Sequence, residues 1–405
     1  MGIVRSLRSV ARFESPVVSG RARRLSRAAN IADLRALAKR NLPGGIFDYI
    51  DGGAEDERTM HRNVSVFDEW EFAPRILRDV SMIDTSTSLL GRTIPFPIVF
   101  SPTGFTRIAH SQGELAVARV AASHGLPYCL STLSTRSIEE VAAVSGGPKW
   151  FQVYVWRDRG MVRDMLSRAS ASGFEAIMLT VDTAVLGRRE RDVRRGFTLP
   201  PKLGPGTIID GIMHPRWTLD FVTHEPITFA NVARSSGNDG GTAVTLSDFI
   251  SQQFDPALSW DDIEWFRGNW DGPIILKGVQ SVEDAVLARS HGIDAVALSN
   301  HGGRQLDGAP TPLSLVAPVV QATDGELPVI CDGGIRRGAD IVKAVALGAS
   351  AVTMGRSYLY GLGAAGEAGV ETALGMLTSE LVRTMQLCGV RSIDGIGEEL
   401  VRPVR

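Results

Sequence analysis

A short apolar segment followed by an amphipathic helical stretch recurs eight times along the chain. The apolar segments lie at residues 97–102, 127–132, 149–155, 176–183, 273–279, 294–303, 328–334 and 350–356. Runs such as residues 295–298 (AVAL) show no alternation of polar and apolar residues, which is typical of parallel strands buried on both faces. Eight such units close most naturally into a (β/α)8 TIM barrel, so the sequence predicts an α/β fold of that kind.

Two parts of the chain stand outside this rhythm. Residues 1–30 hold seven arginines and one acidic residue, Glu14. We expect a flexible basic arm there, with a targeting or membrane-surface segment as the alternative. Residues 187–259 form a long insertion after the fourth strand. Because it leaves the carboxyl end of a strand, where barrel enzymes carry their chemistry, we expect a lid or partner-docking segment, or else a disordered loop. Residues 31–405 would then form one barrel domain.

Composition narrows the class of protein. Of the 405 residues, 44% are hydrophobic and 22% are charged, and the formal net charge is -2. This balance excludes wholesale disorder and a nucleic-acid binder that is basic throughout. Cys129, Cys331 and Cys388 lie far apart and form no CxxC pair, which fits a reducing cytoplasm but neither a disulfide framework nor a zinc site. No apolar run approaches the roughly 18 residues of a membrane span, so at most a peripheral contact with the inner face of the cell membrane is expected.

Polar side chains gather where the predicted strands end. A lone serine or threonine at such a place would cap a turn, but together these residues predict a ring of hydrogen-bonding groups around a polar planar ligand. The residues are Ser101, Thr103, Ser131, Thr132, Gln152, Tyr154, Thr180, Asp182, Lys277, Ser299 and Asn300.

The loops after the seventh and eighth strands carry the residue types of a phosphate site. They read DGGIRRGAD (332–340) and MGRSYLYG (354–361). Glycines let the backbone approach closely, helix N termini present N–H groups to an anion, and Arg336 and Arg356 add positive charge. In barrels these two loops are the usual phosphate site, although turn glycines beside surface arginines would give a similar pattern.

The sixth strand runs into SNHGGRQLDG (299–308), which supplies a histidine and an arginine together. His301 is well placed as a base near neutral pH, and Arg304 offers a fork that matches a carboxylate. Asp182, at the end of the fourth strand, could orient the imidazole and stabilise its protonated form. Among the arginines that follow Asp182, one that faces inward would be a second anion clamp.

Lys277 ends an otherwise apolar strand. A buried ammonium without a partner is costly, so we expect an anionic or strongly accepting group beside it in the barrel mouth. Next to a flavin it could stabilise negative charge on the reduced ring, and with a sugar or aldehyde it could form a Schiff base.

These motifs resemble those of one family. SNHGGRQLDG, DGGIRRGAD, LTVDT, FQVYVW and YIDGGAED are similar to sequences of the FMN-dependent L-2-hydroxy-acid oxidases and dehydrogenases, over residues 31–389. Within that family, FDYIDGGAEDE, SPTGFTR and HPRW most resemble the L-lactate dehydrogenases of actinobacterial type. The resemblance implies FMN as the cofactor, an L-2-hydroxy acid as the substrate and a homotetramer, which is common in the family.

The resemblance also implies a role for each site residue. On the substrate side, His301 would be the base, Asp182 its support, Arg304, Arg189 and Tyr49 the carboxylate clamp, and Tyr154 a partner of the hydroxyl or carboxylate. Lys277 would face the N1 and O2 edge of the flavin. The residues around the ring and ribityl chain would be Pro102, Thr103, Gly104, Ser131, Gln152, Thr180 and Ser299. Those at the ribityl chain and phosphate would be Asp332, Gly334, Arg336, Gly355 and Arg356.

Two positions depart from the pattern of glycolate oxidase within the family. Gly104 stands in place of an alanine near the reactive flavin nitrogen, which argues against rapid use of oxygen. Leu133 stands in place of a tryptophan, which argues for a different side-chain pocket and against glycolate as the favoured substrate.

We therefore expect oxidation of an L-2-hydroxy acid, L-lactate first among them, with electrons passed to a quinone or a redox protein. The alternatives are an oxidase that reduces oxygen to peroxide, a preference for mandelate or longer acids, an FMN-dependent isomerase acting on a phosphorylated isoprenoid, and a scaffold without activity. His301 would serve either a carbanion route or hydride transfer.

Overall fold

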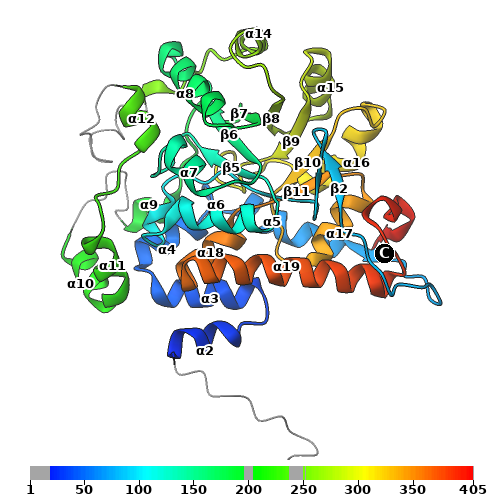
Figure 1. Ribbon diagram of the computed structural model, residues 1–405, viewed down its shortest axis with the longest axis horizontal. Helices are drawn as coiled ribbons and strands as arrows, with labels where there is room; N and C mark the ends of the chain where they lie inside the picture. Colours follow the sequence, from blue (N-terminus) through cyan, green and yellow to red (C-terminus); the bar gives the residue numbers. More distant parts are fainter. Residues whose placement is uncertain (1–18, 196–203, 237–249, 251, 405) are drawn as a thin grey trace, which may run out of the picture.

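The computed structural model describes residues 19–195, 204–236, 250 and 252–404. It confirms the predicted (β/α)8 barrel, in which helices surround a closed parallel sheet (Figure 1). Each strand falls inside one of the eight apolar segments, and the strands close in the order β10, β11, β4, β5, β6, β7, β8, β9. Their bounds are β4 (Ile98–Phe100), β5 (Tyr128–Ser131), β6 (Lys149–Tyr154), β7 (Ala176–Thr180), β8 (Ile274–Val279), β9 (Ala295–Ser299), β10 (Val329–Asp332) and β11 (Ala351–Met354).

The barrel interior has an apolar layer below a polar layer. Because alternate residues of a strand point to the same face, an inward residue is followed two positions later by another. Apolar side chains such as Ile275 and Ile330 pack in one buried cluster, which Leu89 and Ile94 of a separate hairpin also join. Two residues after its inward apolar residue, toward its carboxyl end, each strand contributes an inward polar residue. These are Ser101, Ser131, Gln152, Thr180, Lys277, Ser299, Asp332 and Thr353, and all are buried.

The outer helices follow the predicted order. Ser137, Asp158 and Ser281 each accept a hydrogen bond from the backbone N–H three residues later, and so start three of these helices. The helices of the first seven units are α6 (Gly113–Ser123), α7 (Ile138–Val144), α8 (Arg159–Ala171), α14 (Asp262–Arg267), α15 (Val282–Ser290), α16 (Pro312–Ala322) and α17 (Gly338–Ala346).

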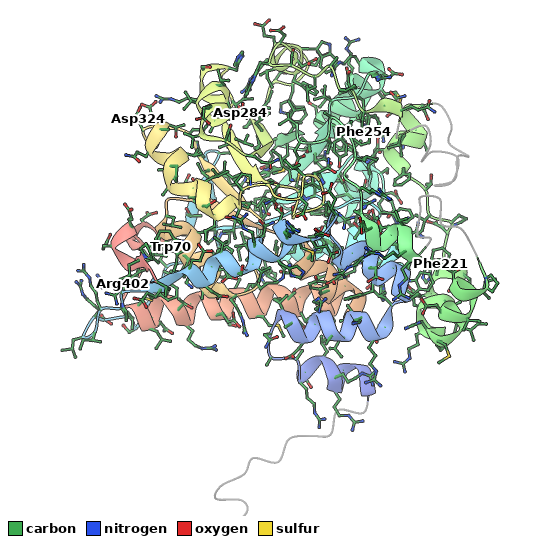
Figure 2. All side chains as sticks on the ribbon, turned by 180° about the vertical axis from the view of Figure 1, so that it is seen from behind. Trp70, Phe221, Phe254, Asp284, Asp324 and Arg402 are labelled. Carbon is green, nitrogen blue, oxygen red and sulfur yellow. The ribbon has the colours of Figure 1, made fainter. Side chains whose placement is uncertain are left out.

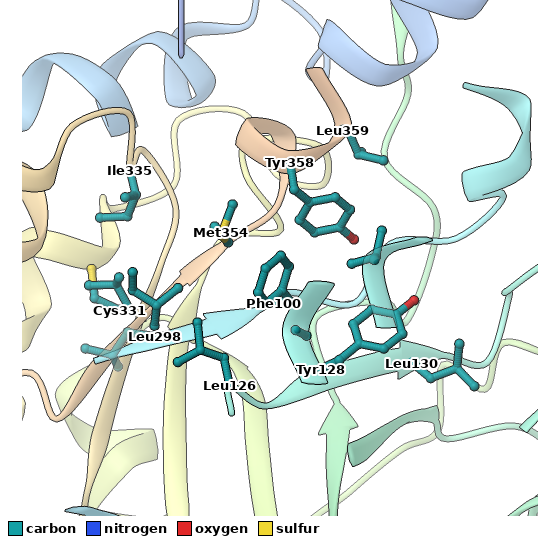
Figure 3. Packing of buried hydrophobic residues seen from close by; sticks show 14 of the residues in the cluster. Phe100, Leu126, Tyr128, Leu130, Leu298, Cys331, Ile335, Met354, Tyr358 and Leu359 are labelled. Carbon is teal, nitrogen blue, oxygen red and sulfur yellow. The ribbon is translucent and has the colours of Figure 1, made fainter. Parts of the chain in front are cut away.

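The last unit contains a helix that the sequence pattern did not indicate. After β11 the chain enters α18 (Arg356–Ala365) directly beyond Gly355, and α19 (Glu367–Cys388) follows after Gly366. Most of the segment MGRSYLYG, which we expected as a loop, is therefore the start of a helix. Figure 3 shows the result in the core, where the rings of Phe100 and Tyr358 lie with their centroids 5.7 Å apart.

Shorter elements lie before and around the barrel. Residues 1–18 of the predicted basic arm lie outside the described residues, and the rest of that arm includes a helix. α3 packs along α18 and α19 (Figure 1). The helices are α2 (Gly20–Ser26), α3 (Ile31–Asn41), α4 (Gly44–Asp51) and α5 (Arg58–Ser65), and the paired strands are β1 (Trp70–Phe72) with β12 (Val401–Pro403) and β2 (Thr87–Leu89) with β3 (Arg92–Ile94).

The insertion after β7 is largely helical where the structure describes it. Its helices are α9 (Glu190–Arg195), α10 (Pro205–Met213), α11 (Pro215–Thr223) and α12 (Ala230–Ser235). Residues 196–203, 237–249 and 251 of the insertion lie outside the described residues. None of the helices described in this chain combines the length and the apolarity that a membrane span requires.

Two glycines let α18 and α19 cross at close range. A Cβ on Gly361 would overlap the carbonyl oxygen of Gly369, and a Cβ on Gly369 would overlap that of Gly361. Gly375, also in α19, has open space where its Cβ would be. A methyl group at Gly361 or Gly369 would therefore collide with the other helix, whereas one at Gly375 would meet no other atom.

We predict that Gly361→Ala lowers the free energy of unfolding by about 1–3 kcal/mol, because the added methyl group forces the two helices apart. Gly375→Ala should raise it by roughly 0.5–1 kcal/mol, because alanine favours a helix and nothing is displaced. Urea denaturation of both variants measures the difference. A Gly361→Ala variant as stable as Gly375→Ala would contradict this account of the crossing.

Candidate active site

A cavity of about 390 Å³ opens at the carboxyl end of the barrel strands. Its floor is the polar layer of the barrel. Part of its wall is apolar, with Phe105, Ile108, Leu133 and Phe229, and another part carries charged groups from the loops after β7 to β11. This division suits a ligand with one polar and one apolar part.

His301 and Asp182 form a pair at the cavity wall. The Nδ1 atom of His301 lies 3.1 Å from Oδ1 and 3.2 Å from Oδ2 of Asp182. The side chain of Asp182 is 2% exposed. Burial alone would raise the pKa of this carboxyl, but His301 and Lys277 lower it below its ordinary value. Because an ionised carboxylate only accepts, Nδ1 donates to it, and Nε2 of the neutral ring is left as a base.

The backbone after β9 takes an unusual course that brings this histidine into place. His301, Gly302 and Gly303 have φ of 58°, 65° and 75°, in the left-handed region. A Cβ on Gly303 would lie 2.5 Å from the backbone nitrogen of Met60, so only glycine fits there. The His301 N–H donates to the Ser299 hydroxyl at 3.0 Å, which fixes the turn.

Two arginines flank the ring of Tyr49. The guanidinium carbons of Arg304 and Arg189 lie 5.1 Å and 5.2 Å from the ring centroid. Arg304 also donates to the carbonyl oxygens of Tyr49, at 2.6 Å, and Gly52, at 3.1 Å. Burial and the nearby charge of Arg189 lower the pKa of Arg304. Two like charges so close favour an anion between them.

Lys277 forms an ion pair with Asp332, as the sequence predicts for a buried lysine. Its Nζ lies 3.0 Å from Oδ2 of Asp332 and donates to the Ser299 hydroxyl at 3.0 Å. Asp332 also accepts from Ser299 at 2.7 Å and from Thr353. Burial alone would raise the pKa of Asp332, but Lys277 and the two hydroxyl donors lower it to about 2. The pair is therefore ionised inside the barrel.

The loops after β10 and β11 form the far end of the cavity. Arg336 lies on its wall, and α18 begins at Arg356 with no side chain capping its N terminus among the described residues. Arg356 donates to the carbonyl oxygens of Ile50, Gly52 and Gly302. An open helix N terminus beside two guanidinium groups attracts an anion.

Nearly all residues predicted for the site reach this one cavity. The exceptions are Thr132, Asp182, Ser299 and Asn300, which do not line it. Asp182 lies behind His301, as expected, whereas Ser299 lies in the polar layer and bonds Lys277, Asp332 and the His301 backbone. Thr132 donates to the carbonyl oxygen of Gln152, and Asn300 donates to Asn63 and to the carbonyl oxygen of Pro310. The predicted residues on the wall are Tyr49, Ser101, Pro102, Thr103, Gly104, Ser131, Gln152, Tyr154, Thr180, Arg189, Lys277, His301, Arg304, Asp332, Gly334, Arg336, Gly355 and Arg356.

Sequence reasoning missed several residues that hold the site. Thr353 lies inside its strand rather than at its end, and counting in twos from Ala351 would have found it. Gln305 donates to the carbonyl oxygens of Asp182 and Val185, both at 2.9 Å, and accepts from the N–H of Gly187. It thereby joins the loops after β7 and β9, and no local pattern announces such a contact.

Known proteins resemble this chain over nearly its whole length. A protein of Mycobacterium tuberculosis provisionally named an L-lactate dehydrogenase is 44% identical over 99% of this chain and 96% of its own. The L-lactate dehydrogenase of Caulobacter vibrioides is 42% identical over 92% of this chain and 97% of its own.

Solved structures that resemble this chain include enzymes that are named for mandelate. The monotopic membrane protein (S)-mandelate dehydrogenase superposes with a TM-score of 0.90 at 39% identity, over 93% of this chain and all of that one. A mandelate oxidase structure with (S)-mandelic acid has a TM-score of 0.78 at 37% identity, covering 93% of this chain and 98% of that one. The family model of the FMN-dependent dehydrogenases matches residues 38–403. The chain therefore belongs to the FMN-dependent dehydrogenase family.

Proposed function

We propose that this protein oxidises L-lactate to pyruvate and passes the electrons to an acceptor at a membrane surface. The observation that carries the proposal is the hydrogen bond between His301 and Asp182, which suits His301 to act as a base. His301 lies on the same cavity wall as the guanidinium groups of Arg189 and Arg304. The relatives named for L-lactate point to this acid, and the apolar wall beside Leu133 would also admit longer or aromatic side chains.

The residues present fit FMN. Bound there, FMN would accept the two electrons of the alcohol. Gln152, Thr180 and Lys277 would bond the edge of its ring from the polar layer, and Thr103 and Gly104 would lie against the ring. Arg336, Arg356 and the open N terminus of α18 would hold the phosphate. The buried charge of Lys277 would favour electron-rich states of the ring.

His301 would remove a proton from the substrate. Asp182 keeps the Nδ1 proton in place, so Nε2 is the atom that takes up the substrate proton, and the carboxylate then stabilises the imidazolium. Arg189 and Arg304 would hold the substrate carboxylate, with Tyr49 between them and Tyr154 nearby. Because that carboxylate is present both before and during the reaction, the arginines contribute binding more than rate.

We predict that L-lactate bleaches the flavin of the holoenzyme under nitrogen, and that His301→Ala slows this reduction at least ~100-fold while FMN stays bound. Stopped-flow absorbance with a panel of L-2-hydroxy acids, including glycolate and mandelate, measures both effects. His124→Ala is the control, because His124 pairs with Glu371 on the surface. Reduction at the normal rate without His301 would exclude it as the base, and no reduction by any acid would exclude the proposed reaction.

The electron acceptor is proposed to be a quinone or a redox protein rather than oxygen. The support is Gly104, which stands in place of the alanine of glycolate oxidase near the reactive flavin nitrogen and argues against rapid use of oxygen. A Cβ on Gly104 would lie 3.1 Å from that of Leu133, so the position is closely packed. The alternative is an oxidase that forms peroxide.

We predict that the reduced holoenzyme transfers electrons to a soluble quinone analogue much faster than to dissolved oxygen. Reoxidation of the flavin is followed in air-saturated buffer and, separately, in anaerobic buffer with the quinone. Rapid peroxide formation in air would overturn the choice of acceptor and leave the hydroxy-acid chemistry standing.

The hairpin of α10 and α11 is the proposed contact with the membrane. It is tied to the barrel by polar bonds, from Gly44 N–H to Asp210, from Ser111 N–H to Asp220 and from the Trp217 indole to Ile108 O. Its outward side is apolar, and Phe221 lies on it at the edge of the molecule (Figure 2). The other exposed apolar residues there are Ile208, Ile209, Ile212, Met213, Leu219 and Val222. A relative described as a monotopic membrane protein supports this reading.

We predict that Ile209→Asp with Ile212→Asp reduces sedimentation with phospholipid vesicles and leaves flavin reduction unchanged. These side chains are 61% and 68% exposed, so the charges should not disturb the fold. Ile76→Asp, at a residue that is 82% exposed on the loop after β1, is the matched control. Equal vesicle binding by all three proteins would contradict the proposed contact.

Three further expectations stay predictions. They are attachment at the inner face of the cell membrane, assembly as a homotetramer, and the division into a basic arm and one barrel domain.

A further inference from the structure

Asp192 is a buried carboxylate beside the proposed substrate clamp. It lies in the first turn of α9, three residues after Arg189, and its side chain is 10% exposed. The Nε atom of Arg189 is 2.9 Å from Oδ2 of Asp192. Neither carboxylate oxygen has a well-aligned hydrogen bond from a described residue. Burying a carboxylate in this way is costly, so its presence requires a reason.

Several charged groups face Asp192. Burial raises the pKa of Asp192 above its ordinary value; Arg189, Arg304 and Arg191 oppose this rise, and Asp48 of α4 adds to it. Arg191 lies nearby but donates to Asp51 at 2.9 Å and to Glu57, on the side where α9 meets α4. The closest cationic partner of Asp192 is therefore Arg189.

Asp192 lies behind Arg189 as seen from the cavity. Arg189 lines the cavity wall, whereas Asp192 does not. The ion pair joins Asp192 to the Nε atom of Arg189, and neither carboxylate oxygen accepts a hydrogen bond from a described residue. The two Nη groups therefore stay available for a second, bidentate partner. A carboxylate placed in this way restricts a long, flexible side chain to one direction.

We propose that Asp192 is a positioning residue for substrate binding, which directs the Nη groups of Arg189 toward the substrate carboxylate. The inference rests on the proposed function, in which Arg189 is part of the clamp. A carboxylate bound alike in the ground state and the transition state contributes to affinity and not to the limiting rate. Loss of Asp192 should therefore weaken substrate binding and leave the chemical step unchanged.

The test is anaerobic stopped-flow reduction of the holoenzyme over a range of concentrations of L-lactate, or of the acid that reduces the flavin fastest. It gives an apparent Kd and a limiting rate. For Asp192→Ala we expect the Kd to rise about tenfold or more, as for loss of a charge-assisted contact, and the limiting rate to stay within about twofold. Asp192→Asn keeps an acceptor for Nε and should weaken binding less, and it also serves if the alanine variant does not fold.

Two further variants separate the outcomes. Glu190→Gln, in the same helix, removes an exposed partner of Arg194 and should change neither constant. Arg189→Met should raise the Kd at least as much as Asp192→Ala. If Arg189→Met raises it but the Asp192 variants do not, or if they lower only the limiting rate, the role of Asp192 is wrong and the clamp stands. If Arg189→Met leaves the Kd unchanged, the clamp itself is wrong.

Discussion

The ion pair of Lys277 and Asp332 is the constraint on which the upper half of the barrel depends. Either charge alone would be prohibitively costly at this depth, and the pair is tolerable because Ser299 and Thr353 satisfy its remaining hydrogen-bonding capacity. The same Ser299 hydroxyl receives the N–H of His301. One buried network thus fixes the polar floor of the cavity and the turn that carries His301.

A second buried network positions the other side of the site. Asp51, at the end of α4, accepts hydrogen bonds from Arg35 of α3, Arg191 of α9 and Tyr360 of α18. Burial alone would raise the pKa of Asp51, but these donors lower it to about 2. The consecutive helices α3 and α4 thus meet α9 and α18, which are distant in sequence, at this carboxylate. Tyr49 lies in the same helix as Asp51, and Arg189 immediately precedes α9, so the proposed clamp depends on the network.

Much of this could be predicted from residues close together in the sequence. The eightfold recurrence of an apolar segment and a helical stretch predicted the barrel. The polar residues at the strand ends indicated the cavity, since parallel strands bring those ends to one edge. The patterns did not indicate α18, because Gly355 and Gly361 suggested a loop while the second of them serves the crossing with α19. Nor did they indicate Thr353, Gln305, Asp51 or Asp192. Their importance arises from partners in other elements, which only the folded chain brings together.

The insertion after β7 carries the two proposed tasks of substrate binding and membrane contact in one continuous stretch of chain. Arg189, on the cavity wall, and the outward apolar hairpin of α10 and α11 both lie within this insertion. With these proposed roles, an exchange of this stretch between related barrels during evolution would transfer acid recognition and membrane attachment together. The eight strands, and the chemistry anchored in them, could be inherited without change.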